Sequence, residues 1–239
     1  MSPSALDRAC EMWAGLARVP VTFPPRGGVS VVASAESWLC PPQWAGIVVL
    51  RGAAIATVPD ARLAAPLRAA LLDQAGEVRV DLDRLRAGLA VADVLGPATL
   101  AYLDAGDFTP AHEGAPVERL PAGHPGVRAL LAGVDGADAD ESGMEEISSA
   151  AFVVRDGQDV VAAAGYRSWP GAVAHLSVLT ARHHRSRGLA RAVASAAVAD
   201  ALDNGMVPQW RARPEPSRRV ARALGFRELG SQVSVRIDL

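Results

Sequence analysis

The sequence contains no lysine, so all 24 basic residues among its 239 are arginines. Because 26 acidic residues balance them, the formal net charge is only −2, and no strong overall field would attract nucleic acid or a membrane surface. Only two cysteines are present, Cys10 and Cys40, and their wide spacing matches neither a disulfide framework nor a zinc-binding pattern. We interpret both as small buried hydrophobic residues.

Long hydrophobic runs are also missing. No run approaches the ~18–20 residues that a membrane-spanning helix needs, and the first residues lack the basic and then apolar order of a signal peptide. We therefore expect a soluble, cytoplasmic protein. Nucleophile elbows, Walker loops and dinucleotide-binding glycine motifs are absent too, which argues against those enzyme classes.

What is present is enough apolar material for two domains. Half of the 239 residues are hydrophobic, and domains typically take ~100–200 residues each. The segment 106–116, with Pro110, Gly114 and Pro116 among polar residues, is the best linker candidate. The sequence therefore predicts a domain boundary between residues 110 and 111.

Residues 1–110 show the pattern of an α/β lobe without a recognisable chemical motif. Ser2 and Pro3 are suited to open a helix, and Leu95-Gly96-Pro97 is expected to break the pattern. Between them we expect strands at 29–33, 46–50 and 53–58 and helices at 63–71 and 82–89.

Residues 111–239 alternate strands and helices. Asp156-Gly157 between two apolar runs is a strong hairpin signal, and Gly205 is placed to end a long helix. The expected order is strand 117–120, helices 126–132 and 140–149, strands 151–155, 160–166 and 172–180, helix 188–204, strand 207–212, helix 217–224 and strand 232–237.

One junction in this second half is suited to bind an anion. A strand ends at Thr180, an arginine-rich loop follows, and a helix then begins at Gly188. The first amides of a helix lack internal partners and carry the positive end of its dipole, so they match a pyrophosphate. Gly188 and Ala190 would let phosphate oxygens approach the backbone, while Arg185 and Arg187 would add charge-assisted hydrogen bonds. On its own, so short a motif also fits an ordinary surface turn.

The stretch from residue 175 to 227 resembles the GNAT (GCN5-related) N-acetyltransferase superfamily. Arg185, Gly188 and Ala190 fill its Q/R-x-x-G-x-G/A motif, and residues 217–226 match most fixed positions of its second segment, S-x-x-x-Y-x-K-L-G-F. The resemblance implies an α/β (α+β) fold for residues 111–239, with a mixed, mostly antiparallel sheet flanked by helices. Residues 1–110 would then be an additional α/β lobe, either degenerate and GNAT-like or on the substrate side.

The resemblance also implies acetyl-CoA as a co-substrate and no metal. In this family the strand before the motif splays from its neighbour, so its backbone is free to bond the pantetheine arm. Carried over position by position, the cofactor-binding residues are Val178, Leu179, Thr180, Arg185, Ser186, Arg187, Gly188, Leu189, Ala190 and Ser217.

Two positions depart from the family pattern. Ala221 stands where a tyrosine often protonates the leaving thiolate, and Pro214 stands where an asparagine is common. Neither side chain can donate the expected hydrogen bond, which puts catalytic activity in question.

The catalytic candidates are three titratable residues that would take a proton from the amine. His175 precedes the motif on its strand and has an unperturbed pKa of about 6.5, whereas Glu145 and Glu146 are expected on the second short helix, which in this superfamily borders the acceptor site. The competing interpretations are a packed histidine and a solvated helix face. Trp169 and Trp210 would line the acceptor pocket or pack in the core.

The leading hypothesis is an acetyl-CoA-dependent N-acetyltransferase whose acceptor is a small-molecule or peptide amine. The first alternative is a catalytically weak or inactive GNAT-fold protein that binds acyl-CoA for regulation. The second is an anion or nucleic-acid binder that uses Arg182, Arg185, Arg187 and Arg191, against which the near-neutral charge argues. We expect no nucleic-acid or membrane partner, and a homodimer is left open.

Overall fold

The computed structural model describes residues 4–72, 78, 80–111 and 115–238 of the chain. Contacts group the chain into two compact units, Met1–Leu100 with Glu228–Leu239, and Ala101–Arg227. The sequence instead predicts a boundary at residues 110 and 111 and assigns the last strand to the second domain. The contacts place that strand in the first unit because it hydrogen-bonds along its length to a strand near the N-terminus.

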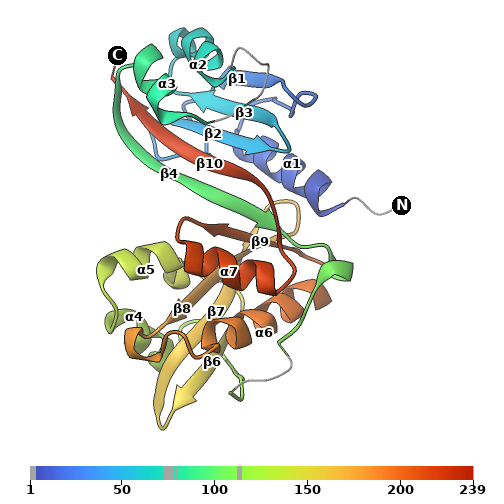
Figure 1. The fold of residues 1–239 in the computed structure, drawn as a ribbon, viewed down its shortest axis with the longest axis vertical. Helices are drawn as coiled ribbons and strands as arrows, with labels where there is room; N and C mark the ends of the chain where they lie inside the picture. The colour runs from blue at the N-terminus through green and yellow to red at the C-terminus, as the bar shows by residue number, and fades with distance from the viewer. Residues whose placement is uncertain (1–3, 73–77, 79, 112–114, 239) are drawn as a thin grey trace. The chain divides into compact units, whose positions relative to one another are not determined.

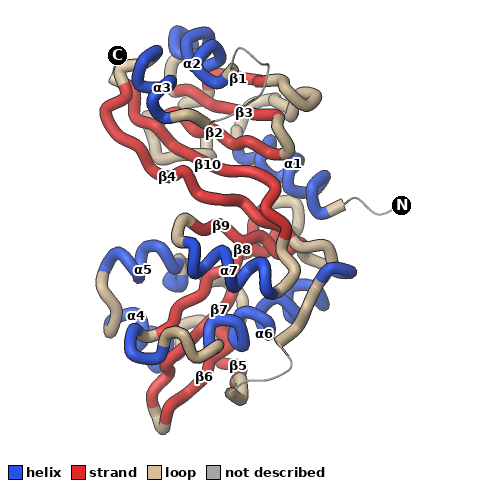
Figure 2. Tube along the Cα trace, viewed as in Figure 1, coloured by secondary structure: helices blue, strands red, loops and turns tan. Residues whose placement is uncertain are grey.

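The first unit is a mixed sheet with helices packed on it (Figures 1 and 2). Its strands follow the order β1-β3-β2-β10-β4. β1 pairs with β3 in parallel, whereas β2 is antiparallel to both β3 and β10. The strands are β1 (Val29–Ala33), β2 (Ala45–Leu50), β3 (Ala53–Val58), β4 (Val91–Tyr102) and β10 (Arg227–Ile237), and the helices are α1 (Ala5–Leu16), η1 (Ala61–Leu63), α2 (Ala64–Leu71) and α3 (Leu82–Gly88).

The first helix begins as a polar N-cap predicts, although at a different residue. Ser2 and Pro3, the expected start, lie outside the described residues. Ser4 caps α1, because its hydroxyl accepts a hydrogen bond from the Asp7 amide and the Asp7 carboxylate accepts one from the Ser4 amide. This reciprocal pair satisfies two backbone donors that a helix start leaves open.

The sequence misses β4, the longest strand of the first unit. Gly96 and Pro97 suggest a break, but the strand runs through both residues. Gly96 has φ +108°, and a Cβ built on it would lie 2.9 Å from the Gln232 carbonyl oxygen of β10. A glycine is therefore needed here because the backbone passes close to the next strand, and it does not end the strand.

The second unit has the predicted fold class. Its sheet follows the order β9-β8-β7-β6-β5, and neighbouring strands are antiparallel except for the parallel pair β8 and β9. The mixed, mostly antiparallel sheet flanked by helices is thereby confirmed. The strands are β5 (Glu118–Leu120), β6 (Ala151–Asp156), β7 (Asp159–Trp169), β8 (Val173–Thr180) and β9 (Val207–Ala212).

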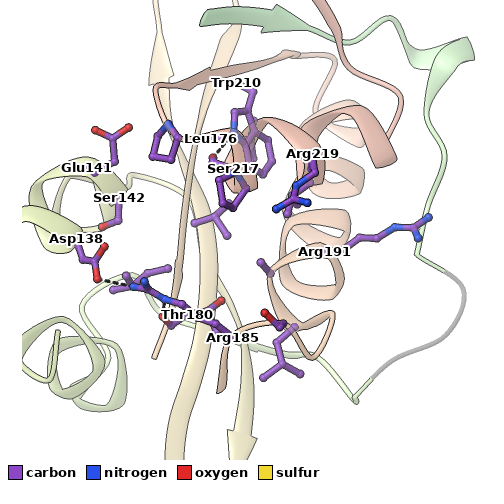
Figure 3. Close-up of a pocket in the computed structure, with 18 of the residues that line it drawn as sticks. Asp138, Glu141, Ser142, Leu176, Thr180, Arg185, Arg191, Trp210, Ser217 and Arg219 are labelled. Atoms are coloured by element: carbon purple, nitrogen blue, oxygen red, sulfur yellow. Dashed lines mark hydrogen bonds and ion pairs between the residues drawn. The ribbon is translucent and has the colours of Figure 1, made fainter. Parts of the chain in front are cut away.

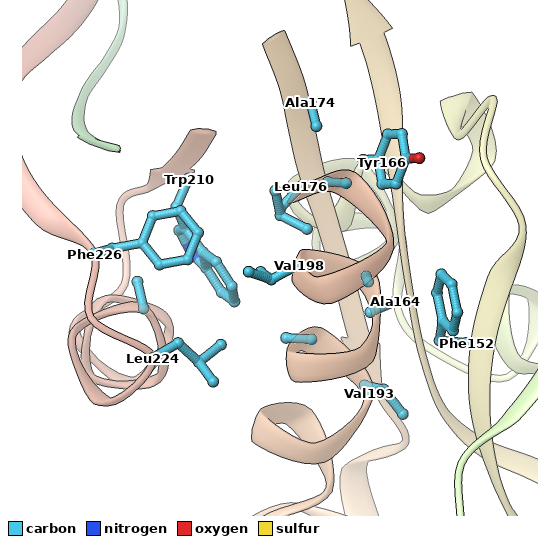
Figure 4. Close-up of a cluster of buried hydrophobic side chains, with 14 of the residues drawn as sticks. Phe152, Ala164, Tyr166, Ala174, Leu176, Val193, Val198, Trp210, Leu224 and Phe226 are labelled. Atoms are coloured by element: carbon cyan, nitrogen blue, oxygen red, sulfur yellow. The ribbon is translucent and has the colours of Figure 1, made fainter. Parts of the chain in front are cut away.

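Helices cover both faces of this second sheet. The elements are η2 (Ala105–Asp107), α4 (Pro125–Ala132), α5 (Gly136–Ser142), η3 (Met144–Glu146), η4 (Arg182–His184), α6 (Leu189–Asp203) and α7 (Glu215–Ala223). α6 packs on one face through small and branched side chains, with Trp210 and Phe226 in edge-to-face contact beside it (Figure 4). α4 and η3 pack on the other face. Small residues such as Ala194 and Ala197 let α6 approach the sheet closely.

One expected helix is shorter than predicted. Residues 140–149 are expected as a single helix, but α5 ends at Ser142 and only the short 3-10 turn η3 follows. Gly143 separates the two elements with φ +59°. A left-handed glycine is a common helix terminator, so the second helix stops before Glu145 and Glu146.

Candidate active site

The site is built where two parallel strands separate. β8 and β9 pair at Val173 with Val207, at Ala174 with Pro208 and at His175 with Gln209. Both strands continue, β8 to Thr180 and β9 to Ala212, but they are no longer paired with each other. The separation leaves the edges of both strands available over this stretch, as the resemblance implies.

A cavity of about 620 Å³ opens beside this separation, lined by β8, β9, α5, α6 and α7. Figure 3 shows its side chains converging from these elements. The structure brings nine of the ten proposed cofactor-binding residues to its wall: Val178, Leu179, Thr180, Arg185, Ser186, Gly188, Leu189, Ala190 and Ser217. Arg187 is the exception and lies exposed outside the lining.

The loop before α6 has the conformation that exposes helix amides. Gly188 is the N-cap of α6 at φ +77°, and no side chain caps the first amides of the helix. A Cβ built on Gly188 would meet nothing within 4 Å, so the space over the helix start is open. Ser186 is also left-handed, at φ +62°. The helix end that suits a pyrophosphate therefore faces the cavity with its donors unused by side chains.

Arg185 is engaged by a carboxylate that the sequence does not connect to it. Its Nη2 lies 2.5 Å from Oδ2 of Asp138 on α5, and its Nε donates to the Thr180 carbonyl at 3.3 Å. Figure 3 shows this pair at one edge of the cavity. The guanidinium is thereby held between α5 and the end of β8, next to the start of α6.

A second carboxylate ties α5 to the residue that follows β9. Glu141 accepts hydrogen bonds from the Arg213 guanidinium, including one of 2.8 Å from Nε, and a longer one of 3.3 Å from its backbone amide. Asp138, Glu141 and Ser142 all line the cavity. The sequence shows no motif for these contacts, because the partners are far apart in the chain.

The imidazole of His175 does not line the cavity. Side chains alternate along a strand, so Leu176 and Val178 face the cavity while His175 is on the opposite face of β8. Its Nδ1 lies 3.1 Å from Oε1 of Gln209, and its ring stacks on Trp169 with centroids 4.5 Å apart. Burial, with lesser help from Arg211 and Arg167, lowers the pKa of His175 to about 3. A histidine with this pKa is a poor base for an ammonium group near neutral pH.

The two glutamates proposed as alternative bases are exposed and also lie outside the cavity lining. Glu146 forms an ion pair with Arg167 on β7 at 2.5 Å. Glu145 has no interaction of this kind among the described residues. Both are on η3 rather than on the expected helix, and Glu146 is near enough to Arg211 on β9 to interact with it electrostatically.

The two departures from the family motif have clear places in the structure. Ala221 is 1% exposed and packs in the core beneath α7, whereas Pro214 lines the cavity and caps the helix without a side-chain hydrogen bond. Ser217, one turn into α7, accepts a hydrogen bond of 3.0 Å from the Trp210 indole. The hydroxyl that α7 offers to the cavity is therefore that of Ser217.

Two absences concern only the part of the chain that the structure describes. There, no group of three or more His, Cys, Asp or Glu side chains is placed to hold a metal ion. Likewise, none of the described helices has the length and apolarity needed to cross a membrane.

Residues 148–231, which contain the strand separation, the loop and α7, match the family model described as GNAT acetyltransferase. In this part of the chain the sequence is therefore similar to the GNAT acetyltransferase family. No curated protein matches the sequence. The GNAT assignment covers the cavity-lining strands and helices except α5, which precedes the matched segment.

Solved structures of GNAT proteins are similar at low sequence identity. A GCN5-related N-acetyltransferase from Kribbella flavida is 19% identical, with 65% of this chain and 62% of that chain covered and a TM-score of 0.49. An acetyltransferase of the GNAT family from Colwellia psychrerythraea is 14% identical, with 76% and 75% covered and a TM-score of 0.47. The chain thus spans less than two thirds of the length of the Kribbella protein.

Proposed function

We propose that this GNAT domain transfers an acetyl group from acetyl-CoA to the amine of a small molecule or peptide. The observation that carries the proposal is the separation of β8 and β9 beside the uncapped start of α6, in one cavity. An extended ligand with a pyrophosphate fits that combination, because it needs both a strand edge and a cluster of free amides.

Each part of the cavity has a role in this proposal. The backbone of Val178, Leu179 and Thr180 offers strand-edge hydrogen bonds to the pantetheine arm. The amides at Leu189 and Ala190, at the start of α6, hold the pyrophosphate. Arg185 adds positive charge next to it when it exchanges its bond with Asp138 for one with phosphate.

The reaction is direct attack of a neutral amine on the thioester carbonyl carbon, with formation of the C–N bond and cleavage of the C–S bond. The amine nitrogen gives up a proton to solvent, and the departing CoA thiolate takes one up. Ser217 is placed to help at the second step, since its oxygen already accepts from Trp210 and its own O–H remains to donate to the sulfur. The Ser217 hydroxyl would thus take the place of the family's tyrosine hydroxyl, because the residue at the tyrosine position here is the buried Ala221.

The carboxylates that line the cavity are poorly placed to act as a base, because Asp138 lies with Arg185 at the proposed pyrophosphate end of the cavity and Glu141 is bound to Arg213. Because the lowered pKa of His175 also makes it a weak base, we assign removal of the amine proton to water. The rate is then expected to rise with pH until the free amine itself is fully deprotonated.

The alternative is a GNAT domain that binds acyl-CoA without transferring the acyl group. It is favoured by Ala221 being buried in the core and by Pro214 at the cavity wall, because neither contributes a hydrogen bond. Under both alternatives the cavity binds acetyl-CoA, so binding and turnover have to be measured separately. A cytoplasmic location stays a prediction.

The first experiment is calorimetric titration of the full chain with acetyl-CoA, followed by CoA release in the presence of phenethylamine, butylamine and glycinamide. Gly188→Glu should abolish binding, since it puts a carboxylate where the phosphate is proposed to sit. Gly205→Glu, a left-handed glycine at the other end of α6 with equally open surroundings, is the matched control and should retain binding. Unchanged affinity of Gly188→Glu would refute the site, and tight binding without CoA release would favour the alternative.

A further inference from the structure

Three polar side chains, buried at Tyr102 and Gln209 and half-buried at His175, form a hydrogen-bonded chain that ends where β8 and β9 separate. Gln209 is fully buried on β9, and Tyr102 is 1% exposed. The Gln209 amide donates from Nε2 to the Tyr102 hydroxyl at 3.0 Å, and its Oε1 lies 3.1 Å from Nδ1 of His175. Buried polar groups of this kind are costly unless they are paired, and the Gln209 amide is paired at both its nitrogen and its oxygen.

With the Gln209 amide in this orientation, its oxygen determines which imidazole nitrogen carries the hydrogen. A carbonyl oxygen only accepts, so Nδ1 of His175 has to donate to Oε1 of Gln209. A neutral imidazole has a single N–H, and Nε2 is therefore left as an acceptor. Among the described residues the imidazole makes no other hydrogen bond. The stacked Trp169 ring, inclined by 18°, restrains the plane of the imidazole.

The acceptor nitrogen, Nε2 of His175, belongs to a residue at the point where β8 and β9 separate beside the proposed cofactor site. His175 and Gln209 are the last paired residues before the strands diverge, and the next residue, Leu176, lines the cavity. His175 and Ser177 share the face opposite α6, and the Ser177 hydroxyl donates to the Gly143 carbonyl on that side. His175 therefore stands at the point of separation, on the side of the sheet away from the proposed pyrophosphate site.

We propose that the Tyr102–Gln209–His175 chain holds His175 as its neutral Nδ1–H tautomer, so that Nε2 accepts a hydrogen bond from the N–H of the incoming amine and positions it. His175 is a positioning residue here and does not remove the proton. The proposal rests on the acetyltransferase function proposed above and assigns the amine-side contact that the cofactor motif leaves open.

The charges around the ring agree with a permanently neutral imidazole. Arg211 on β9 and Arg167 on β7 both disfavour a positive charge on His175, and Glu146 on η3 is paired with Arg167. Burial is the largest cause, and together these effects lower the pKa of His175 to about 3. The acceptor thus persists across the pH range in which acetyl transfer to an amine is practicable.

Nitrogen-15 NMR of the free, histidine-labelled protein tests the first half of the proposal without any ligand. The sequence has five histidines, and His175→Gln assigns the relevant signals by their loss. We expect a protonated Nδ1 and an unprotonated Nε2 whose shifts stay constant from pH 5 to pH 9. A proton on Nε2, or titration near pH 6.5, would overturn the proposal.

Tyr102→Phe is the variant that disturbs the chain most gently. It removes the oxygen that orients the Gln209 amide, so we expect the two neutral tautomers of His175 to become mixed. Tyr166→Phe is the matched control, because the other tyrosine of the sequence bonds instead to Asp200 on α6. Its histidine spectrum should equal that of the unchanged protein, and an equal effect of both variants would contradict the proposed chain.

The role toward the amine is tested by steady-state kinetics with phenethylamine, butylamine and glycinamide. Tyr102→Phe should raise the KM for the amine about two-fold, because roughly half of the imidazole then presents an acceptor at Nε2, while the affinity for acetyl-CoA and the pH profile stay unchanged. Equal KM values in the two proteins would overturn the positioning role. If the unchanged protein binds acetyl-CoA but acetylates none of the amines, the proposed acetyltransferase function fails, and the positioning role of His175 fails with it. The NMR measurement still decides which tautomer His175 adopts.

Discussion

The indole nitrogen of Trp210 donates a hydrogen bond of 3.0 Å to the hydroxyl of Ser217 (Figure 3). Trp210 directly follows the last paired residue of β9, and Ser217 faces the same cavity from α7. This contact joins the point of strand separation to the second segment of the family motif. It also gives the Ser217 hydroxyl a defined orientation, because its oxygen accepts and its proton is left to donate.

Ser217→Ala tests whether this hydroxyl assists the leaving thiolate. We expect kcat to fall about 10-fold or more, because a hydrogen bond to a charged group contributes ~1.5–3 kcal/mol, while the Kd for acetyl-CoA changes little. The free energy of unfolding should drop by ~1–3 kcal/mol, since the buried indole N–H loses its acceptor. Ser217→Thr keeps the hydroxyl and should retain most activity. Equal kcat in the alanine and threonine variants would rule out the role.

Gly188→Ala separates backbone strain from phosphate binding. A residue with a Cβ at φ +77° is strained, so urea unfolding should show a loss of ~1–2 kcal/mol. Acetyl-CoA binding should also weaken, because any relaxation of the strain turns the first amides of α6 away. Gly205→Ala, at φ +68° after the end of the same helix, provides the comparison. It should cost similar stability and leave the Kd unaltered; a parallel loss of affinity would mean that only helix stability matters.

Asp138→Asn tests whether the carboxylate competes with phosphate for Arg185. Without the ion pair the guanidinium is free to turn to the cofactor, so acetyl-CoA should bind up to ~5-fold more tightly, the range that a partly exposed ion pair allows. Asp140→Asn makes the same charge change at an exposed residue of α5 and is the control. Calorimetry at low and high salt gives both affinities. Weaker binding in Asp138→Asn would show instead that the pair positions Arg185 productively.

The half-buried imidazole of His175 predicts a loss of stability in acid. Its pKa is lowered to about 3 in the folded protein and is near 6.5 when unfolded, so between these values only the unfolded chain binds the proton. The contribution of His175 to the free energy of unfolding is therefore complete above pH 6.5. It is lost as the pH falls toward 3, by at most about 1.4 kcal/mol per pH unit. Urea unfolding at pH 4, 5, 6 and 7 measures this slope.

His175→Gln should flatten that dependence, because it removes the titrating group. His183→Gln, at an exposed histidine of η4, should leave the slope as it is in the unchanged protein. An identical slope in all three proteins would show that other groups dominate the acid response.

Short-range features of the second unit follow from the sequence alone. The hairpin at Gly157, the start of α6 after Gly188 and the bounds of β9 agree with the predicted positions, since each depends on a few neighbouring residues. Gly96 shows where such reasoning fails. The same dipeptide signal that marks turns elsewhere here marks a close approach to β10, and only the neighbouring strand distinguishes the two.

For the site, the sequence by itself determined the anion-binding loop from Arg185 to Ala190 and its pairing with the segment that contains Ser217, because both are local patterns with fixed spacing. Only the tertiary structure decided what surrounds them. Asp138 meets Arg185 across 47 residues, and Gln209 meets Tyr102 across 107. Contacts over such separations depend on how the strands pair and the helices pack, and they place the imidazole of His175 against Gln209 and Trp169 and outside the cavity lining.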